Sequence, residues 1–374
     1  MRVAPKPLVL VHGLWSNWQA WESWQNILTT SHSYDWKAFP VGEKPEHGRM
    51  NTGGSFMSTD PTSSIGENAR ELEKYIDYAQ KDRNAWHVDL VAHSMGGLIS
   101  RYYISQIVPP GGHDGRPPVS KLIMLGTPNL GSPCSDYMNA AFEMLGKNVE
   151  AVRQLQTEYV ANFNRVHTQR KGVRFSALAG EVLPTICYAN EWNDGVVTVP
   201  SAIYNVADNA KSKNVHTELT GTADFSAFVK PRIAIGPKGN HNPDAPTLPA
   251  GMADARTSRF YGAADSRDAF ALAEPPPAVS WAKEVRLAAK QSVEIEVPVA
   301  AGPNFGAVFM APSDISITLI DNNGSIVGTN LAGSPESRAW FRSIFVNSPV
   351  TAGKWKIRFE NTSERELSAI AAAR

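Results

Sequence analysis

A serine flanked by small residues stands where a short apolar run changes into a helical pattern. The stretch reads Val88-Asp89-Leu90-Val91-Ala92-His93-Ser94-Met95-Gly96-Gly97-Leu98. Because Ala92, Gly96 and Gly97 let a strand, a tight turn and a helix approach closely, Ser94 is expected to protrude from the sheet. The N–H of Met95 would open the helix and point where an oxyanion forms. The pattern predicts a nucleophile elbow with Ala92 at the first glycine position. The alternative is a packed turn with a structural role only.

Two later residues could serve a nucleophilic serine as acid and base. Asp194 stands before Gly195 and a β-branched pair, and His216 follows it along the chain. A histidine can take the proton of the serine, and an aspartate can hold the imidazole in the required tautomer. A tight turn is the alternative interpretation of Asp194. Glu181, directly after a strand, and His241, in a Pro-rich stretch, are rival candidates for acid and base.

The elements around these residues alternate between strand and helix. Ser64-Ile65-Gly66-Glu67 has a capping pattern that opens a helix leading into the strand before Ser94. Continuous apolar runs over 7–11, 121–125 and 173–179 predict buried parallel strands. A turn over 126–133 follows one of them, at the edge where open α/β sheets bind ligands. These elements predict an α/β fold with a mostly parallel sheet.

Aromatic and apolar residues give candidates for the walls of a pocket. Trp18, Trp21 and Trp24 have helical spacing and indicate a face that packs on the core, whereas Trp15, beside the turn His12-Gly13-Leu14, is the better candidate for a pocket wall. Residues 40–64 read as a long surface loop. Residues 135–168 look helical and rich in Met, Phe, Leu and Tyr, so they predict either packing helices or a lid over the pocket.

Composition excludes several classes of protein. The 374 residues contain 36 Lys plus Arg and 36 Asp plus Glu, so no basic excess favours nucleic acid or an anionic membrane as partner. No apolar run is long enough to span a bilayer, and no signal peptide is expected at this N-terminus. Cys134 and Cys187 can form one disulfide or remain two buried thiols.

These motifs resemble the bacterial lipase and esterase branch of the α/β-hydrolase family over roughly residues 7–235. The resemblance rests on His12-Gly13-Leu14, Ala92-His93-Ser94-Met95-Gly96, Asp194-Gly195-Val196-Val197 and His216. It implies a Ser94–His216–Asp194 triad, with the N–H groups of Leu14 and Met95 as oxyanion hole and His12 orienting the loop. It implies no cofactor. Some relatives bind calcium near this histidine, but Glu218 is the only nearby acid, so no metal is predicted.

The C-terminal quarter has a different pattern. Residues 236–278 accumulate Gly, Pro, Ala and Asp and read as a linker between an α/β domain (1–235) and a further domain (279–374). Residues 292–299, 315–319 and 354–359 alternate apolar and polar, and Asp321-Asn322-Asn323-Gly324 signals a hairpin. They predict a β-sandwich. This part resembles the pre-peptidase C-terminal type of domain, which implies a secreted enzyme whose signal has been removed.

The sequence therefore predicts a serine carboxylic ester hydrolase, a lipase or esterase, that forms an acyl-enzyme and acts on small-molecule or polymeric esters. An acyltransferase with the same triad is one alternative. A binding protein without activity on a hydrolase scaffold is another, because fold alone does not determine activity. The location is expected to be extracellular, with the cytoplasm as the alternative.

Overall fold

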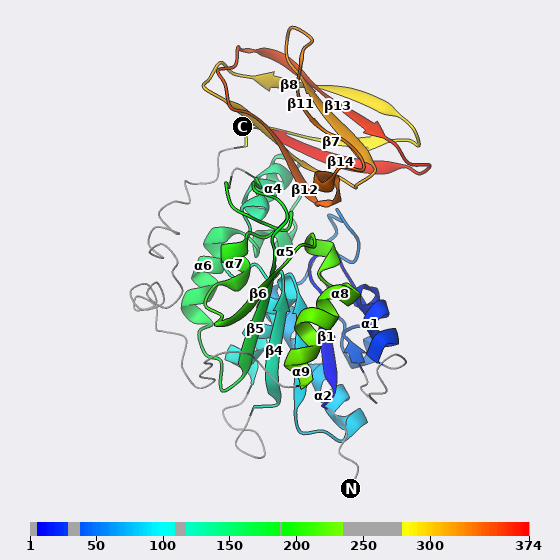
Figure 1. Ribbon diagram of the computed structural model, residues 1–374, viewed down its shortest axis with the longest axis vertical. Helices are drawn as coiled ribbons and strands as arrows, with labels where there is room; N and C mark the ends of the chain where they lie inside the picture. The colour runs from blue at the N-terminus through cyan, green and yellow to red at the C-terminus, as the bar shows by residue number, and fades with distance from the viewer. Residues whose placement is uncertain (1–5, 29–37, 109–116, 188, 235–278, 374) are drawn as a thin grey trace.

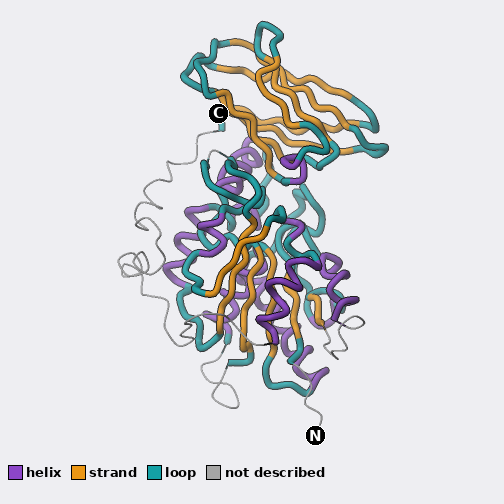
Figure 2. Tube along the Cα trace, viewed as in Figure 1, coloured by secondary structure: helices purple, strands orange, loops and turns teal. Residues whose placement is uncertain are grey.

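The computed structural model describes residues 6–28, 38–108, 117–187, 189–234 and 279–373. An open parallel sheet flanked by helices forms one part of the molecule, and two stacked antiparallel sheets lie at one end of it (Figures 1 and 2). The predicted fold class is confirmed. The predicted linker, 236–278, lies outside the described residues, and the domain boundaries stay predictions. We call residues 6–234 the α/β region and residues 279–373 the C-terminal sandwich.

The parallel sheet has six strands in the order β2-β1-β3-β4-β5-β6, and every neighbouring pair is parallel. Its strands are β1 (Leu8–Val11), β2 (Ala38–Pro40), β3 (Val88–His93), β4 (Val119–Leu125), β5 (Arg174–Gly180) and β6 (Asp208–Ser212). Since all strands run the same way, the loops that follow them meet at one edge of the sheet. The predicted site residues stand in these loops.

Helices connect the strands and cover both faces of the sheet. The α-helices are α1 (Glu22–Asn26), α2 (Ile65–Arg83), α3 (Met95–Tyr102), α4 (Pro133–Met144), α5 (Glu150–Arg153), α6 (Thr157–Val166), α7 (Val199–Ile203), α8 (Thr222–Asp224) and α9 (Lys230–Ala234). Short 3₁₀ or π turns are η1 (Trp18–Trp21), η3 (Pro45–His47), η4 (Tyr103–Ile107), η5 (His216–Glu218) and η6 (Phe225–Val229). The capping box predicted at Ser64 and Glu67 is present at the start of α2.

Two hydrophobic cores lie on the two faces of the sheet, because successive strand residues point to opposite sides. Val9 and Val11 belong to a core that includes residues of α2, α3 and α4. Leu8 and Leu10 belong to a second core, with aromatic residues of η1, α1 and η6. Trp21 and Trp24 are fully buried there, on two short helical pieces rather than one helix.

Two strands of the parallel sheet escape prediction from the sequence. β6 has the sequence Asp-Asn-Ala-Lys-Ser, and its middle residues are partly or fully exposed because it is an edge strand. β2 has three residues and is the opposite edge. Edge strands carry a weak apolar signal, since one side and much of each face meet solvent.

The C-terminal sandwich consists of two four-stranded antiparallel sheets, ordered β11-β10-β13-β8 and β12-β9-β14-β7. The strands are β7 (Trp281–Leu287), β8 (Ser292–Val299), β9 (Phe305–Met310), β10 (Ile315–Ile320), β11 (Ile326–Asn330), β12 (Phe341–Val346), β13 (Gly353–Asn361) and β14 (Leu367–Ala373), with a 3₁₀ turn η7 (Pro335–Arg338) before β12. The predicted hairpin turn at 321–324 joins β10 to β11. The resemblance to the pre-peptidase C-terminal type stays a prediction.

One sheet of the sandwich is buried on both faces. Along β9, Ala307 and Phe309 point into the sandwich core, while Val308 and Met310 join the core of the α/β region. β14 does the same with Ile370 and Ala372. These two strands therefore lack the apolar–polar alternation by which β8, β10 and β13 are predicted. The sandwich and the α/β region consequently share a continuous apolar interface.

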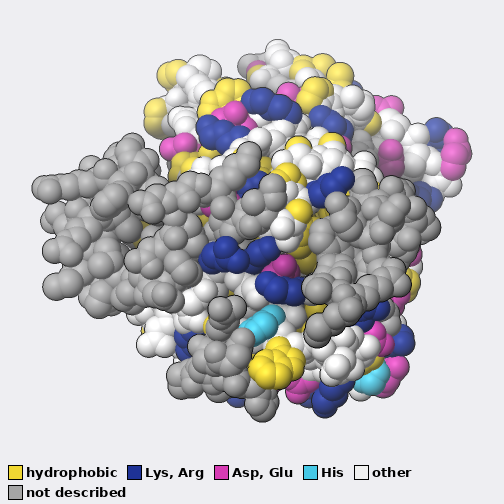
Figure 3. All heavy atoms as spheres, turned by 60° about the horizontal axis from the view of Figure 1, so that its bottom comes forward, with side chains coloured by type: hydrophobic (Ala, Val, Ile, Leu, Met, Phe, Trp, Pro, Cys, Tyr) yellow, Lys and Arg dark blue, Asp and Glu magenta, His cyan; other side chains and the backbone are white. Residues whose placement is uncertain are grey.

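No helix of the described residues is both long and apolar enough to cross a bilayer. Basic and acidic side chains occur together on the face at the end of the α/β region away from the sandwich (Figure 3).

Candidate active site

Ser94 occupies the sharp corner between β3 and α3. Its backbone has φ 56° and ψ −131°, a conformation rare for a residue with a side chain, and its N–H donates to the carbonyl of Leu125 at 2.9 Å. A Cβ on Gly96 would lie 2.5 Å from the carbonyl oxygen of Val11, and one on Gly97 would lie 2.0 Å from Oγ1 of Thr127. Only glycine fits at both positions, so the strained corner is held by close packing.

The loop after β1 packs directly against this corner. A Cβ on Gly13 would lie 2.6 Å from the Cβ of Ser94 and 3.1 Å from the nitrogen of Met95. Oγ1 of Thr52 donates to the carbonyl of Gly13 at 2.7 Å, and the N–H of Trp15 donates to the carbonyl of Thr52 at 2.7 Å. The loops that carry the predicted donors Leu14 and Met95 therefore meet beside Ser94.

Asp194 and His216 lie in contact, although 22 residues separate them. Nδ1 of His216 donates to Oδ2 of Asp194 at 2.8 Å, and its backbone N–H donates to the carbonyl of Asp194 at 2.8 Å. Oδ1 of Asp194 accepts from the N–H groups of Val196 and Val197 at 2.9 and 2.7 Å. With Nδ1 protonated, Nε2 of His216 is the free base position of the ring.

A second histidine fixes the backbone of the first. Nε2 of His93 donates to the carbonyl of His216 at 2.8 Å, and the two ring centroids are 4.7 Å apart. Burial, together with the nearby charge of His216, lowers the pKa of His93 to about 3. Burial also lowers the pKa of His12, in the loop after β1, to about 4. Both rings are neutral at neutral pH, so His93 links the serine corner to His216 without adding charge.

The alternative candidates for the acid and the base are not found beside His216 in the described residues. Glu181 forms ion pairs with Lys211 and Lys213 at 2.6 and 2.9 Å, and these partners lower its pKa. His241 lies outside the described residues. Glu218 pairs with Arg338 of the sandwich at 3.0 Å. Across the described residues, no three His, Cys, Asp or Glu side chains cluster as metal ligands would.

The predicted pocket residue Trp15 is the centre of an aromatic group. Its ring lies 5.7 Å from Phe56, 6.5 Å from Phe142 of α4 and 5.8 Å from Trp340 of the sandwich, measured between centroids. The helices predicted over 135–168 are present as α4, α5 and α6, with Phe142 buried in the core. Whether they act as a lid stays a prediction.

The site is nearly closed. Only 4% of Ser94 and 2% of His216 is exposed, and Nε2 of His216 is buried with no hydrogen-bond partner among the described residues. The ring of Trp340 lies 6.1 Å from that of His216. An ester therefore meets a nearly closed site in this conformation.

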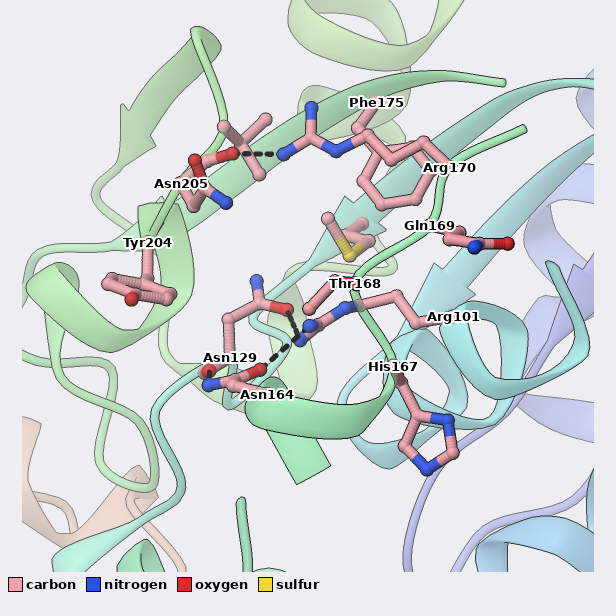
Figure 4. A pocket seen from close by; sticks show the side chains of 12 residues that line it. Arg101, Asn129, Asn164, His167, Thr168, Gln169, Arg170, Phe175, Tyr204 and Asn205 are labelled. Carbon is pink, nitrogen blue, oxygen red and sulfur yellow. Dashed lines mark hydrogen bonds between the residues drawn. The ribbon is translucent and has the colours of Figure 1, made fainter. Parts of the chain in front are cut away.

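A separate cavity of about 40 Å³ lies beside α3 (Figure 4). Arg101 of α3 points into it and donates to Oδ1 of Asn129 at 2.9 Å and of Asn164 at 2.7 Å. Burial and the charge of Arg170 lower the pKa of Arg101 to about 10. Ser94, Asp194 and His216 do not line this cavity. We interpret Arg101 as a brace between the helix that follows Ser94 and the turn after β4.

Cys134 and Cys187 form a disulfide. It joins α4 to the loop between β5 and α7, which also carries Asp194. Of the two possibilities that the sequence leaves open, the structure contains the bridge.

Sequence reasoning misses the contributions of Thr52, Trp340 and Arg338. Thr52 stands in the long loop 40–64, whose length is a general sign of function. Arg338 follows Glu218 by 120 residues, Trp340 lies still further along the chain, and no motif marks either of them. Only the packing of the sandwich brings them to the site.

Two solved structures of one bacterial lipase resemble this chain. The Bacillus licheniformis lipase BlEst2 in its propeptide form superposes with a TM-score of 0.55 and 20% identity, covering 100% of this chain and 75% of that one. The mature form of the same lipase gives 0.46 and 20%, covering 62% of this chain and 93% of that one. The first likeness supports the fold alone.

Sequence comparison gives the family. Triacylglycerol lipase 2 of Saccharomyces cerevisiae is 27% identical over an alignment of 156 residues, and the match covers 35% of this chain and 45% of that protein, less than half of the relative. The model of the family described as "Putative serine esterase (DUF676)" matches residues 4–203, more than half of the chain and including Ser94 and Asp194. The chain therefore belongs to this serine esterase family.

Proposed function

We propose that this protein hydrolyses carboxylic esters, with Ser94 as nucleophile, His216 as general base and acid, and Asp194 as the group that orients the imidazole. The observation that carries the proposal is the buried His216–Asp194 hydrogen bond of 2.8 Å, which His93, the neighbour of Ser94, links to a serine held in a strained corner. Membership of the esterase family supports the same reaction class.

The reaction divides into two halves. Oγ of Ser94 attacks the ester carbonyl carbon while Nε2 of His216 takes the hydroxyl proton, and the carbonyl oxygen becomes an oxyanion facing the N–H groups of Leu14 and Met95. The C–O bond to the alcohol then breaks, and His216 protonates the leaving alcohol. Water, deprotonated by His216, attacks the acyl-enzyme, and the carboxylic acid leaves as Oγ of Ser94 regains its proton.

Asp194 contributes by holding His216 rather than by moving a proton. Its Oδ1 is fixed by the N–H groups of Val196 and Val197, which leaves Oδ2 for Nδ1 of His216. This arrangement keeps Nε2 as the acceptor and stabilises the imidazolium that forms during each half-reaction.

We infer that the acyl group is apolar, as in lipid esters. Trp15, Phe56 and Trp340 pack against one another, with Trp340 beside His216, and aromatic walls favour hydrocarbon chains over polar ones. The name of the yeast relative, a triacylglycerol lipase, points to the same substrate class. Hydrolysis of polymeric esters is a separate proposal, to be measured with a polymeric ester as substrate.

Hydrolysis of p-nitrophenyl esters by three forms of the protein tests the proposal. We expect Ser94→Ala to lower kcat by about 10⁴-fold or more. The matched control is Ser100→Ala, since Ser100 is a buried serine of α3, the helix after Ser94, and its hydroxyl donates to the carbonyl of Gly96. Equal rates for wild type and Ser94→Ala would refute the role of Ser94. A product ester that accumulates when an alcohol is added would favour acyl transfer instead.

We further propose that the protein is exported, because disulfides persist in oxidising compartments. The Cys134–Cys187 bridge supports this location. Thiol labelling of the protein in culture medium and in cell extract, with and without reductant, tests it: free thiols in the native protein would contradict it.

A further inference from the structure

A short segment of the C-terminal sandwich lies over the proposed active site. It comprises η7 and the start of β12, residues 335–341, and we call it the covering segment (Figure 1). The N–H of Phe341 donates to the carbonyl of Gly195 at 3.4 Å, and a Cβ on Gly195 would lie 2.5 Å from the Cβ of Ala339. Gly195 is the neighbour of Asp194, so the segment touches the loop between β5 and α7 that carries Asp194, which we call the acid loop.

Trp340 is the part of this segment that reaches His216. Its ring centroid lies 6.1 Å from that of His216, 5.8 Å from that of Trp15 and 4.9 Å from that of Phe56. Trp15 follows the predicted oxyanion donor Leu14 in the chain. Trp340 therefore stands between the base and the oxyanion loop, where the acyl part of a bound ester would have to pass.

The covering segment is anchored at some residues and open at others. Ser337, Ala339 and Phe341 are buried, and Phe341 belongs to the core of the α/β region. Pro335, Glu336 and Arg338 are exposed. The ion pair between Arg338 and Glu218 has about half-exposed partners, and such pairs contribute little to stability. In contrast, β9 and β14 bury apolar side chains against the α/β region. The backbone of the segment is therefore anchored, and the part that can turn aside is the side chain of Trp340, which is only partly buried.

From these contacts we propose that Trp340 is a substrate-site residue supplied by the sandwich. Its ring shields Ser94 and His216, and when the ring turns aside an acyl chain takes its place against Trp15 and Phe56. This inference rests on the proposed function, because it assumes that Ser94 is the nucleophile. It assigns to the sandwich a direct part in ester selection.

The access of Ser94 can be measured without turnover. A p-nitrophenyl alkylphosphonate ester reacts once with an activated serine: the Oγ–P bond forms, the P–O bond to p-nitrophenolate breaks, and the released phenolate is counted. We expect Trp340→Ala to react at least tenfold faster than wild type, and Trp340→Phe to react at an intermediate rate. With p-nitrophenyl esters, the smaller residue should also raise the rate for long acyl chains more than for acetate.

The matched control is Trp281→Ala. Trp281 is a partly buried tryptophan of the same sheet that packs on the core of the sandwich rather than on the site. We expect Trp281→Ala to be phosphonylated at the wild-type rate. A wild-type or slower rate for Trp340→Ala, with an unchanged far-UV spectrum and melting temperature, would overturn the inference.

A second variant keeps the tryptophan and loosens the segment. Arg338→Glu places a carboxylate beside Glu218 and should raise the phosphonylation rate about two- to fivefold, with the difference from wild type shrinking in 0.5 M NaCl. This variant tests the inference if Trp340→Ala does not fold. An unchanged phosphonylation rate for Arg338→Glu would count against the shielding of Ser94 by Trp340. Failure of the proposed function looks different: the phosphonate would not label Ser94 in any variant.

Discussion

His216 is held very differently on its two sides. On the side of the α/β region, Asp194 accepts hydrogen bonds from both its ring and its backbone N–H, and His93 donates to its carbonyl, all at 2.8 Å. On the side of the sandwich, it meets the ring of Trp340 at 6.1 Å, with one exposed ion pair nearby. Short hydrogen bonds fix the groups proposed for chemistry to one another, whereas the part-buried ring of Trp340 meets His216 through a ring contact alone. This difference suits a site that must open without losing its alignment.

The largest effect should come from breaking the fixed side. Asp194→Asn keeps the shape of the side chain but can donate to Nδ1 of His216, which favours the wrong tautomer. We expect kcat to fall by about 10⁴-fold, with KM changed little. Asp136→Asn is the control, because Asp136 is also a buried aspartate, bonded to the N–H and hydroxyl of Thr157 at the start of α6. Comparable losses in the two variants would contradict the assignment.

The disulfide should contribute the next largest effect, on stability. Removing it by Cys134→Ser together with Cys187→Ser frees a loop of 53 residues in the unfolded chain. The chain-entropy model gives a loss of about 4 kcal/mol in the free energy of unfolding. Guanidinium titration measures it, with wild type in reductant as comparison. A loss below about 1 kcal/mol would mean that the acid loop owes its position to packing alone.

Acid pH should lower the free energy of unfolding, because His93 and His12 are neutral in the folded protein. Folding lowers the pKa of His93 to about 3 and of His12 to about 4, so between these values and the unfolded pKa of 6.5 the unfolded chain binds more protons. The free energy of unfolding should therefore fall as pH drops from 6.5 to 4, by up to about 1.4 kcal/mol per pH unit for each histidine.

His93→Gln gives the control for this pH dependence, since the amide can still donate to the carbonyl of His216 but does not titrate. Thermal unfolding of the variant should show a slope smaller by one proton than that of wild type. Identical slopes would show that His93 is not the source. Activity of the variant should stay within about tenfold of wild type, because the hydrogen bond is retained.

The smallest effect on stability should come from a change in the covering segment. Arg338→Gln removes an ion pair whose side chains are 48% and 38% exposed. Its free energy of unfolding should change by less than about 1 kcal/mol. A larger loss in a denaturant titration would show that the Arg338–Glu218 ion pair is part of the stable framework, and the contrast between the two sides of His216 would disappear.

Local patterns predict much of the fold because they depend on neighbours in the sequence. The capping residues Ser64 and Glu67 begin α2, and the small residues around Ser94 are found where only glycine fits. The apolar runs mark the buried strands β1, β4 and β5. Edge strand β6 and the doubly buried β9 and β14 are missed, because exposure and burial on both faces each remove the pattern that identifies a strand.

By itself the sequence determined the chemistry available to the site: a serine at a strand-to-helix corner, an aspartate and a histidine in the right order, and glycines that allow close approach. The tertiary structure decided which acid meets His216, that Cys134 and Cys187 are bridged, and that Trp340 covers the site. The physical reason is distance along the chain. Motifs record short-range geometry, whereas the partner of a buried side chain depends on how whole layers pack.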